Sequence, residues 1–307
     1  MKNQNLAITV KQLSYQYQAE RYSIAYALIL IMIGIAGLFQ KTEIILPEFA
    51  ALAIGCFVYR NASWLEKPWH LFLIPSATAI VGFWINQLDI SISVKLIIIV
   101  ISMFIMLRVF KVALGPALAT GLLPIITNCN SLLFIASILF FMFVLAFIVS
   151  VFLKQPQKTE GNRTDSGNPF QLWIYLALLI TWIIFCSVAH IMEIAAFPPV
   201  IVTGYESIHK KEYTNMMFSK QIAALIVAAL IGSLTIQYID SYLLCALINC
   251  IGVTLTLKAL NFKMGPAYAM ALLPMILHTN LNIYFSLKVG LMALVILGTV
   301  RIYKKIA

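Results

Sequence analysis

Residues Leu107 to Phe134 read LRVFKVALGPALATGLLPIITNCNSLLF, and a matching stretch, LKALNFKMGPAYAMALLPMILHTNLNIY, runs from Leu257 to Tyr284 at an offset of 150 residues. Both copies keep a Gly-Pro-Ala triplet and a second proline nine positions after its glycine. Apolar identities alone would be weak evidence, but this spacing of Gly and Pro indicates an internal duplication. The same offset pairs Glu43 with Glu193 and Gly82 with Gly232.

The composition around these two copies is that of an integral membrane protein. Of 307 residues, 62% are hydrophobic and only 10% are charged, and the mean hydropathy is +0.95. Soluble domains carry about 45–50% apolar and about 25% charged residues, so a water-soluble fold is excluded. Disorder is excluded as well, because disordered chains have low hydropathy. We expect an all-α, polytopic membrane protein.

Twelve apolar segments follow one another along the chain, and a polar stretch at 154–169 separates the first six from the last six. If they cross the membrane in turn, only Lys41, Lys95 and Lys288 of the 21 Lys and Arg fall on one side. This asymmetry predicts that both termini and the 154–169 linker are cytoplasmic, in a cell membrane. The segments lie at about 22–40, 43–59, 69–88, 91–107, 112–127, 131–153, 171–190, 194–208, 217–238, 240–257, 263–278 and 281–300.

Each copy of the duplication holds six of these segments. An even number of crossings gives both copies the same orientation, so we expect two parallel repeats, at 1–153 and 170–307, related by a pseudo-twofold axis along the membrane normal. Transporters often place their substrate path at such an interface. The alternative is that the duplication merely replaced a homodimer. The sequence leaves further self-association into a homo-oligomer open.

The fifth and eleventh segments are predicted to be short or broken. Gly115 to Ile126 makes about 18 Å of helix, well below the ~30 Å of a hydrocarbon core. A buried helix start exposes N–H groups and a partial positive charge, which suit an anion. The alternative is that these small residues only allow close packing and that the basic residues before them are topology anchors. The candidate substrate-binding residues are Gly115, Pro116, Ala117, Gly265, Pro266, Ala267, Arg108 and Lys258. Lys111 and Lys263 lie about one turn further on.

Signatures of other function classes are missing from the sequence. It holds no HExxH, GxSxG or phosphate-binding loop and no Cys/His cluster at metal spacing, so we expect no enzyme, no cofactor and no metal site. The net charge of +10 is mostly a topology signal. We therefore expect membrane lipids and a small solute as partners, and no nucleic acid.

At these segments the chain resembles the HPP family of integral membrane proteins. Phe49–Trp69 resembles the family's small-residue helix, and Ser76, Ala77 and Gly82 resemble the helix that follows. Leu107–Leu122 and Leu257–Leu272 resemble the approach to the family's His-Pro-Pro signature, which reads Leu-Gly-Pro and Met-Gly-Pro here. Plant members are associated with nitrite transport. The resemblance therefore implies a membrane architecture and a small anion.

Taken together, the repeats, the short segments and the basic residues predict a membrane transporter or permease for a small solute. A small anion is the first expectation, with its path between the two halves. The alternative is a non-transporting membrane scaffold or accessory subunit, in which the two Gly-Pro-Ala helices serve only for packing.

Overall fold

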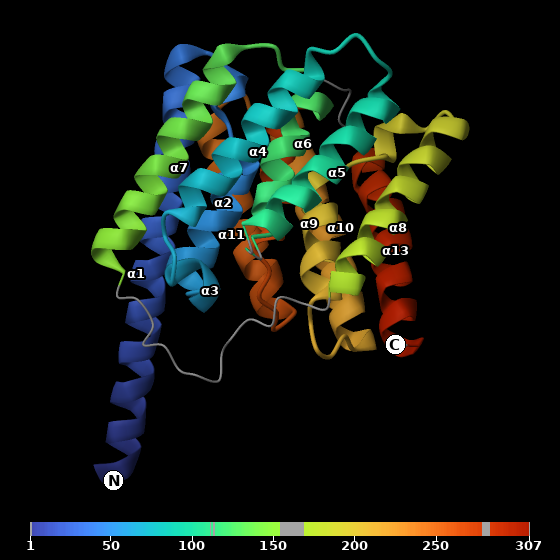
Figure 1. The fold of residues 1–307 in the computed structure, drawn as a ribbon. Helices are drawn as coiled ribbons and strands as arrows, with labels where there is room; N and C mark the ends of the chain where they lie inside the picture. Colours follow the sequence, from blue (N-terminus) through green and yellow to red (C-terminus); the bar gives the residue numbers. More distant parts are fainter. Residues whose placement is uncertain (1, 111, 113, 154–168, 278–282, 307) are drawn as a thin grey trace.

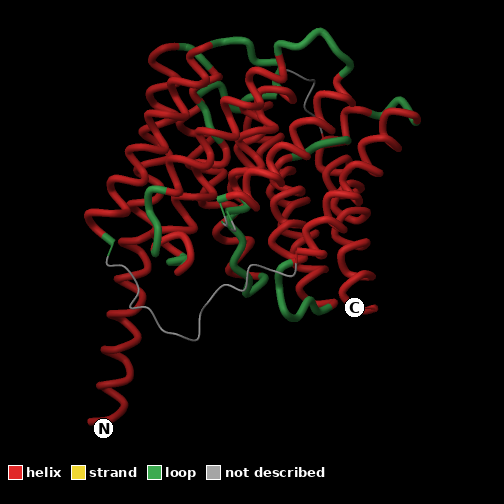
Figure 2. The backbone as a smooth tube through the Cα atoms, viewed as in Figure 1, coloured by secondary structure: helices red, strands yellow, loops and turns green. Residues whose placement is uncertain are grey.

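The computed structural model describes residues 2–110, 112, 114–153, 169–277 and 283–306, and the described chain is all-helical (Figures 1 and 2). Helices make up 82% of it, and no strand occurs in these ranges. The expected all-α class is confirmed. The predicted linker at 154–169 falls outside the described residues except for Pro169, and the division into domains at this linker stays a prediction.

The elements follow one another as a series of long helices interrupted by short ones. The first part of the chain forms α1 (Lys2–Phe39), η1 (Thr42–Ile44), α2 (Pro47–Ala53), η2 (Ile54–Val58), α3 (Ala62–Leu65), α4 (His70–Asn86), α5 (Ile92–Val109), α6 (Pro116–Ile126) and α7 (Leu132–Phe152). The second part forms α8 (Pro169–Val188), η3 (Met192–Ile194), α9 (Pro198–Ile208), α10 (Asn215–Tyr238), α11 (Tyr242–Ala259), α12 (Pro266–Leu272), η4 (Leu273–Met275) and α13 (Ile283–Ile306).

Seven of the described helices are long and apolar enough to span a membrane. They belong to α1, α5, α7, α8, α10, α11 and α13, with mean hydropathies between 1.7 and 3.1. No more than half of each span is buried within the bundle, so apolar side chains such as Leu38 (84% exposed) and Phe140 (56%) face outward. Apolar surface on this scale is suited to lipid, and it is consistent with a membrane protein.

Five of the twelve expected segments contain helices too short to meet this length. They are the segments of α2, α4, α6, α9 and α12. The seven long helices therefore give a lower number of clear spans than the twelve that the hydropathy pattern predicts. The chain nevertheless begins and ends at one end of the bundle: α1 starts there, extending well beyond its neighbours, and α13 finishes there (Figure 1).

Four of the short helices, α2, α6, α9 and α12, lie together in the interior. α2 contacts α6 and α12, and α9 contacts the same two helices. All residues of α2 and α12 are buried, and so are all of α6 except Ile126. Each of the four begins with proline in its first turn, where the missing N–H leaves no hydrogen bond unmade. The predicted helix starts after Gly115 and Gly265 are observed, and α6 extends for only 11 residues.

The second proline of each Gly-Pro-Ala segment affects its helix differently in the two copies. Pro124 is accommodated inside α6, close to its end at Ile126. At Pro274 the α-helix gives way to the 3₁₀ turn η4. Both arrangements end the helix within a few residues, as expected for a residue that cannot donate to the preceding turn.

Several local features recur 150 residues apart in the described chain. The 3₁₀ turns η1 and η3 occupy equivalent positions, and each follows a residue with positive φ, Gln40 (51°) and His190 (58°), that ends the long helix before it. Gly82 and Gly232 are also equivalent. A Cβ on Gly82 would overlap the carbonyl oxygen of Gly121 on α6, and a Cβ on Gly232 would overlap that of Ala271 on α12. The α4–α6 and α10–α12 pairs are therefore packed backbone against backbone.

Candidate functional site

The start of α6 is buried against α9. Pro116 and Ala117 are buried with it, and a Cβ placed on Gly115 would lie 3.0 Å from Cγ1 of Val202 and 3.3 Å from Oε1 of Glu206. Glu206 lies in the last turn of α9, four residues before Lys210. The end of α6 that should attract negative charge thus has a carboxylate of the protein beside it.

Lys210 follows the last turn of α9 and completes this charged group. Burial lowers the pKa of Lys210, while the carboxylate of Glu206 opposes that shift. Its ammonium group also lies 5.5 Å from the centre of the Phe262 ring, an arrangement that attracts a cation to the ring face. Glu206 is not among the residues predicted from the sequence. The sequence feature that could have identified it is a lone carboxylate in an apolar segment, four residues before a lysine.

The start of α12 has different surroundings. Gly265, Pro266 and Ala267 are buried, and a Cβ on Gly265 would lie 3.1 Å from the carbonyl oxygen of Ala51 on α2. The Tyr59 hydroxyl accepts a hydrogen bond from the backbone N–H of Met264 at 3.3 Å. Backbone and hydroxyl groups therefore surround this helix start. These contacts include no carboxylate.

A hydroxyl cluster lies next to the start of α12. The Tyr268 and Thr254 hydroxyls are 2.6 Å apart, and Thr254 also pairs with the hydroxyl of Tyr26 on α1. Tyr26 donates a further hydrogen bond to the carbonyl oxygen of Cys250, at 3.0 Å. The cluster joins α1 of the first predicted copy to α11 and α12 of the second.

The two basic candidates are exposed and lie over aromatic rings. The guanidinium carbon of Arg108 is 5.6 Å from the ring centre of Trp173 on α8, and Nζ of Lys258 is 5.6 Å from that of Tyr22 on α1. Each of these contacts joins the fourth segment of one predicted copy to the first segment of the other. Lys263 is exposed, and Lys111 lies outside the described residues. Neither ring belongs to the start of α6 or of α12.

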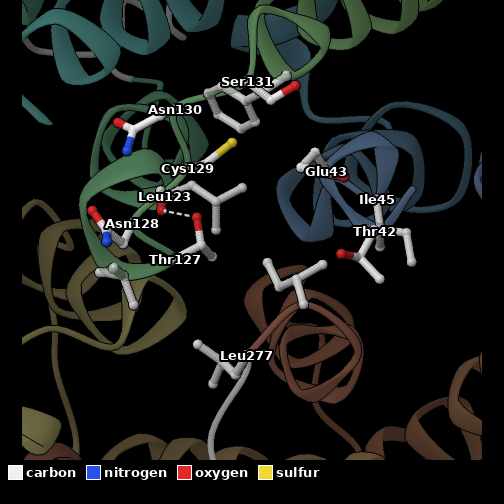
Figure 3. A pocket seen from close by; sticks show the side chains of 13 residues that line it. Thr42, Glu43, Ile45, Leu123, Thr127, Asn128, Cys129, Asn130, Ser131 and Leu277 are labelled. Carbon is white, nitrogen blue, oxygen red and sulfur yellow. Dashed lines mark hydrogen bonds between the residues drawn. The ribbon is translucent and has the colours of Figure 1, made fainter. Parts of the chain in front are cut away.

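A pocket of about 720 Å³ opens at the other end of α6, beside η1. Its lining comes from η1 and the residue after it, from the last turn of α6 and the loop to α7, and from the chain after η4. Figure 3 shows Thr42 and Thr127 on opposite sides of the opening, with Leu277 on a third side. The pocket therefore lies between segments of both predicted copies, at the opposite end of α6 from the predicted anion site.

The lining of this pocket is mixed: apolar side chains such as Ile126, Phe134 and Leu277 alternate with polar groups, one of them acidic. Thr127, Asn128 and Asn130 supply hydroxyl and amide groups, and Glu43 is its one ionisable carboxylate. The Asn86 amide on α4 donates to Oδ1 of Asn130 at 3.0 Å and to the carbonyl oxygen of Cys129 at 3.2 Å, which fixes the loop. Such a lining can hold a hydrated or hydrogen-bonding solute. This pocket was not predicted from the sequence.

No family model matches the chain, and neither a curated protein nor a solved structure matches it. The resemblance to the HPP family stays a prediction.

Proposed function

We propose that the protein is a membrane transporter or permease for a small solute, with its path between two pseudo-symmetric halves. The observation that carries the proposal is the pocket at the end of α6. Residues near 42–45 and 123–134 of the first predicted copy line it together with Ile276 and Leu277 of the second. Four short helices, α2, α6, α9 and α12, pack together in the interior where full spans would be expected. Interrupted helices inside a bundle are the usual setting of a solute site in transporters.

The proposed architecture is twelve crossings in two parallel six-segment repeats, with both termini on the cytoplasmic side of a cell membrane. Support comes from the features that recur at an offset of 150 residues, from η1 and η3 to the backbone contacts of Gly82 and Gly232. The common end at which α1 starts and α13 finishes supports an even number of crossings (Figure 1). In this orientation the pocket faces the outside.

The first proposed substrate class is a small anion that binds at the start of α6, with Gly265, Pro266 and Ala267 as the matching residues on α12. The carboxylate of Glu206 beside Gly115 supports a site for negative charge, since a helix start favours an anion. An incoming anion would replace this carboxylate, which would turn towards Lys210.

The alternative function is a membrane scaffold or accessory subunit. It is favoured by the close burial of Gly115 and Gly265 against α9 and α2, an arrangement that serves packing as well as binding. The pocket distinguishes the two proposals, because a scaffold has no need for an opening with polar groups between its halves.

Reconstitution tests transport directly. Proteoliposomes on a solid-supported membrane are exposed in turn to chloride, nitrate, nitrite, phosphate and short carboxylates, and protein-free liposomes serve as the control. We expect at least one anion to give a protein-dependent current or counterflow signal that saturates with concentration. Absence of any such signal from correctly folded protein would favour the scaffold.

Neutralising the basic candidates tests whether they attract the anion. A unit charge about 10 Å away in water contributes about 0.4 kcal/mol, so Arg108→Gln or Lys258→Gln should raise the half-saturating anion concentration about twofold. Arg108→Lys keeps the charge and is the matched control. Unchanged uptake kinetics in both glutamine variants, at normal expression, would remove these residues from the site and leave them as membrane anchors over Trp173 and Tyr22.

A further inference from the structure

Glu48 is an isolated carboxyl group in the interior of the bundle. It is the second residue of α2, and its side chain is only 1% exposed. Neither Oε1 nor Oε2 has a hydrogen-bond partner among the described groups. Every other residue of α2 is buried too. Glu48 therefore differs from the polar residues of this interior whose hydrogen bonds hold helices together, such as Asn249.

The helices around α2 offer Glu48 no positive charge. The elements that pack most extensively against α2 are α1, η2, α6, α7 and α12. The sequences of α6, α7 and α12 contain no Lys, Arg, His, Asp or Glu, and α1 has none after Arg21. The titratable groups that these five elements provide from Tyr22 onward are Tyr22 and Tyr26 of α1, Cys56 of η2 and Tyr268 of α12. On the pocket side, Glu43 of η1 is a second acid.

This environment favours the neutral form of the carboxyl group. An ionised carboxylate without partner or counter-charge is strongly unfavourable in a low-dielectric interior. Glu48 can lose its proton only when water or another partner reaches it. Ionisable residues inside membrane segments are rare, and they commonly mark proton relays and ion paths.

An opening large enough for water, the pocket, lies close to Glu48 along the chain. Ile45 lines the pocket and stands three residues before Glu48, a distance that an extended chain spans in at most about 11 Å. On its other side, α2 passes into the π-helical turn η2 (Ile54–Val58), a geometry that is rare and often found at functional positions. In the chain, Glu48 thus lies between an open pocket that carries polar groups and an irregular point of its own helix.

We propose that Glu48 is a proton-binding site, which takes up one proton from the pocket water and releases it when α2 and its neighbours rearrange, so that a proton moves with the transported solute. The chemistry is a simple balance: a carboxylate and a proton form a carboxylic acid, and the same O–H bond breaks on release. The coupling part rests on the proposed transport function, but the proton site does not.

Infrared difference spectroscopy of the full-length protein in proteoliposomes tests the site without any solute. The buffer is stepped between acidic and alkaline pH, and the carbonyl stretch of protonated carboxyl groups is recorded. We expect a pH-dependent band in the wild type that is lost in Glu48→Gln, an isosteric and neutral replacement. Glu206→Gln and Glu66→Gln, at a second interior carboxylate and at an exposed one, should retain it. A spectrum unchanged by Glu48→Gln, or a Glu48 band that does not respond to pH, would overturn the proposal.

A second arm tests coupling with any anion of the panel that gives a current. In the wild type, an imposed proton gradient should change the initial current at least fivefold, and in Glu48→Gln this ratio should fall to about one while exchange at equal pH persists. Equal gradient dependence in both proteins would overturn the coupling. If no anion gives a current, the transport proposal fails by itself, and the infrared result still decides whether Glu48 exchanges a proton.

Discussion

Replacing Gly82 with alanine is expected to lower the free energy of unfolding by about 2–3 kcal/mol, and replacing it with valine is expected to prevent folding. A Cβ at this position overlaps the carbonyl oxygen of Gly121 and lies 3.1 Å from Cγ of Pro124. Overpacking usually costs about 1–3 kcal/mol when side chains can adjust. Here the obstacle is mainly backbone, so α4 and α6 must move apart. Gly232→Ala should have a similar effect, because its Cβ meets the backbone of Ala271.

The chain offers a graded series of controls for this prediction. A Cβ on Gly252 meets only the side chain of Ile231, at 3.1 Å, and it should cost less than about 1 kcal/mol. Gly37 and Gly298 have nothing within 4 Å, so alanine there should be neutral or stabilising by about 0.5–1 kcal/mol. The stability of each variant is measured by heating it in detergent and recording, by size-exclusion chromatography, how much folded protein remains. Wild-type stability of both Gly82→Ala and Gly232→Ala would contradict the backbone packing of α4 on α6 and of α10 on α12.

The sequence predicted those parts of the fold that depend on local chemistry. Apolar runs of about 20 residues became the long helices, and Gly-Pro marked the starts of α6 and α12 because proline favours a first helical turn. Span length was harder to predict. The segment at 43–59 is as apolar as a span, but Pro47 starts a new helix inside it and the π-helical turn η2 follows. Hydropathy averages over such breaks.

The candidate site was less accessible from sequence, since it depends on contacts between distant segments. The start of α6 was predicted from Gly115 and Pro116, but the carboxylate beside it comes from α9, about 90 residues away in the chain. Glu48 looks like an ordinary first-turn acid until the packing of α12, α6 and α7 around α2 is known. The pocket also forms where separate segments meet, which no single motif encodes.

Chemical blockage of the pocket tests the central claim, that the solute passes between the two halves. A cysteine is placed at Thr42, which lines the pocket, in a protein whose pocket cysteine, Cys129, is replaced by serine. Cysteine is close in size to threonine, so transport should survive until a bulky, membrane-impermeant thiol reagent is attached. The matched control is Asp89→Cys, in the exposed loop between α4 and α5 and outside the pocket lining.

The measurement is the proteoliposome current of each variant before and after complete labelling, with a parallel test for labelling from outside in intact cells. We expect the reagent to reach Thr42→Cys from outside and to reduce its current at least tenfold, while labelled Asp89→Cys keeps its full current. A fully labelled Thr42→Cys protein that transports as fast as the unlabelled one would contradict a path through this pocket.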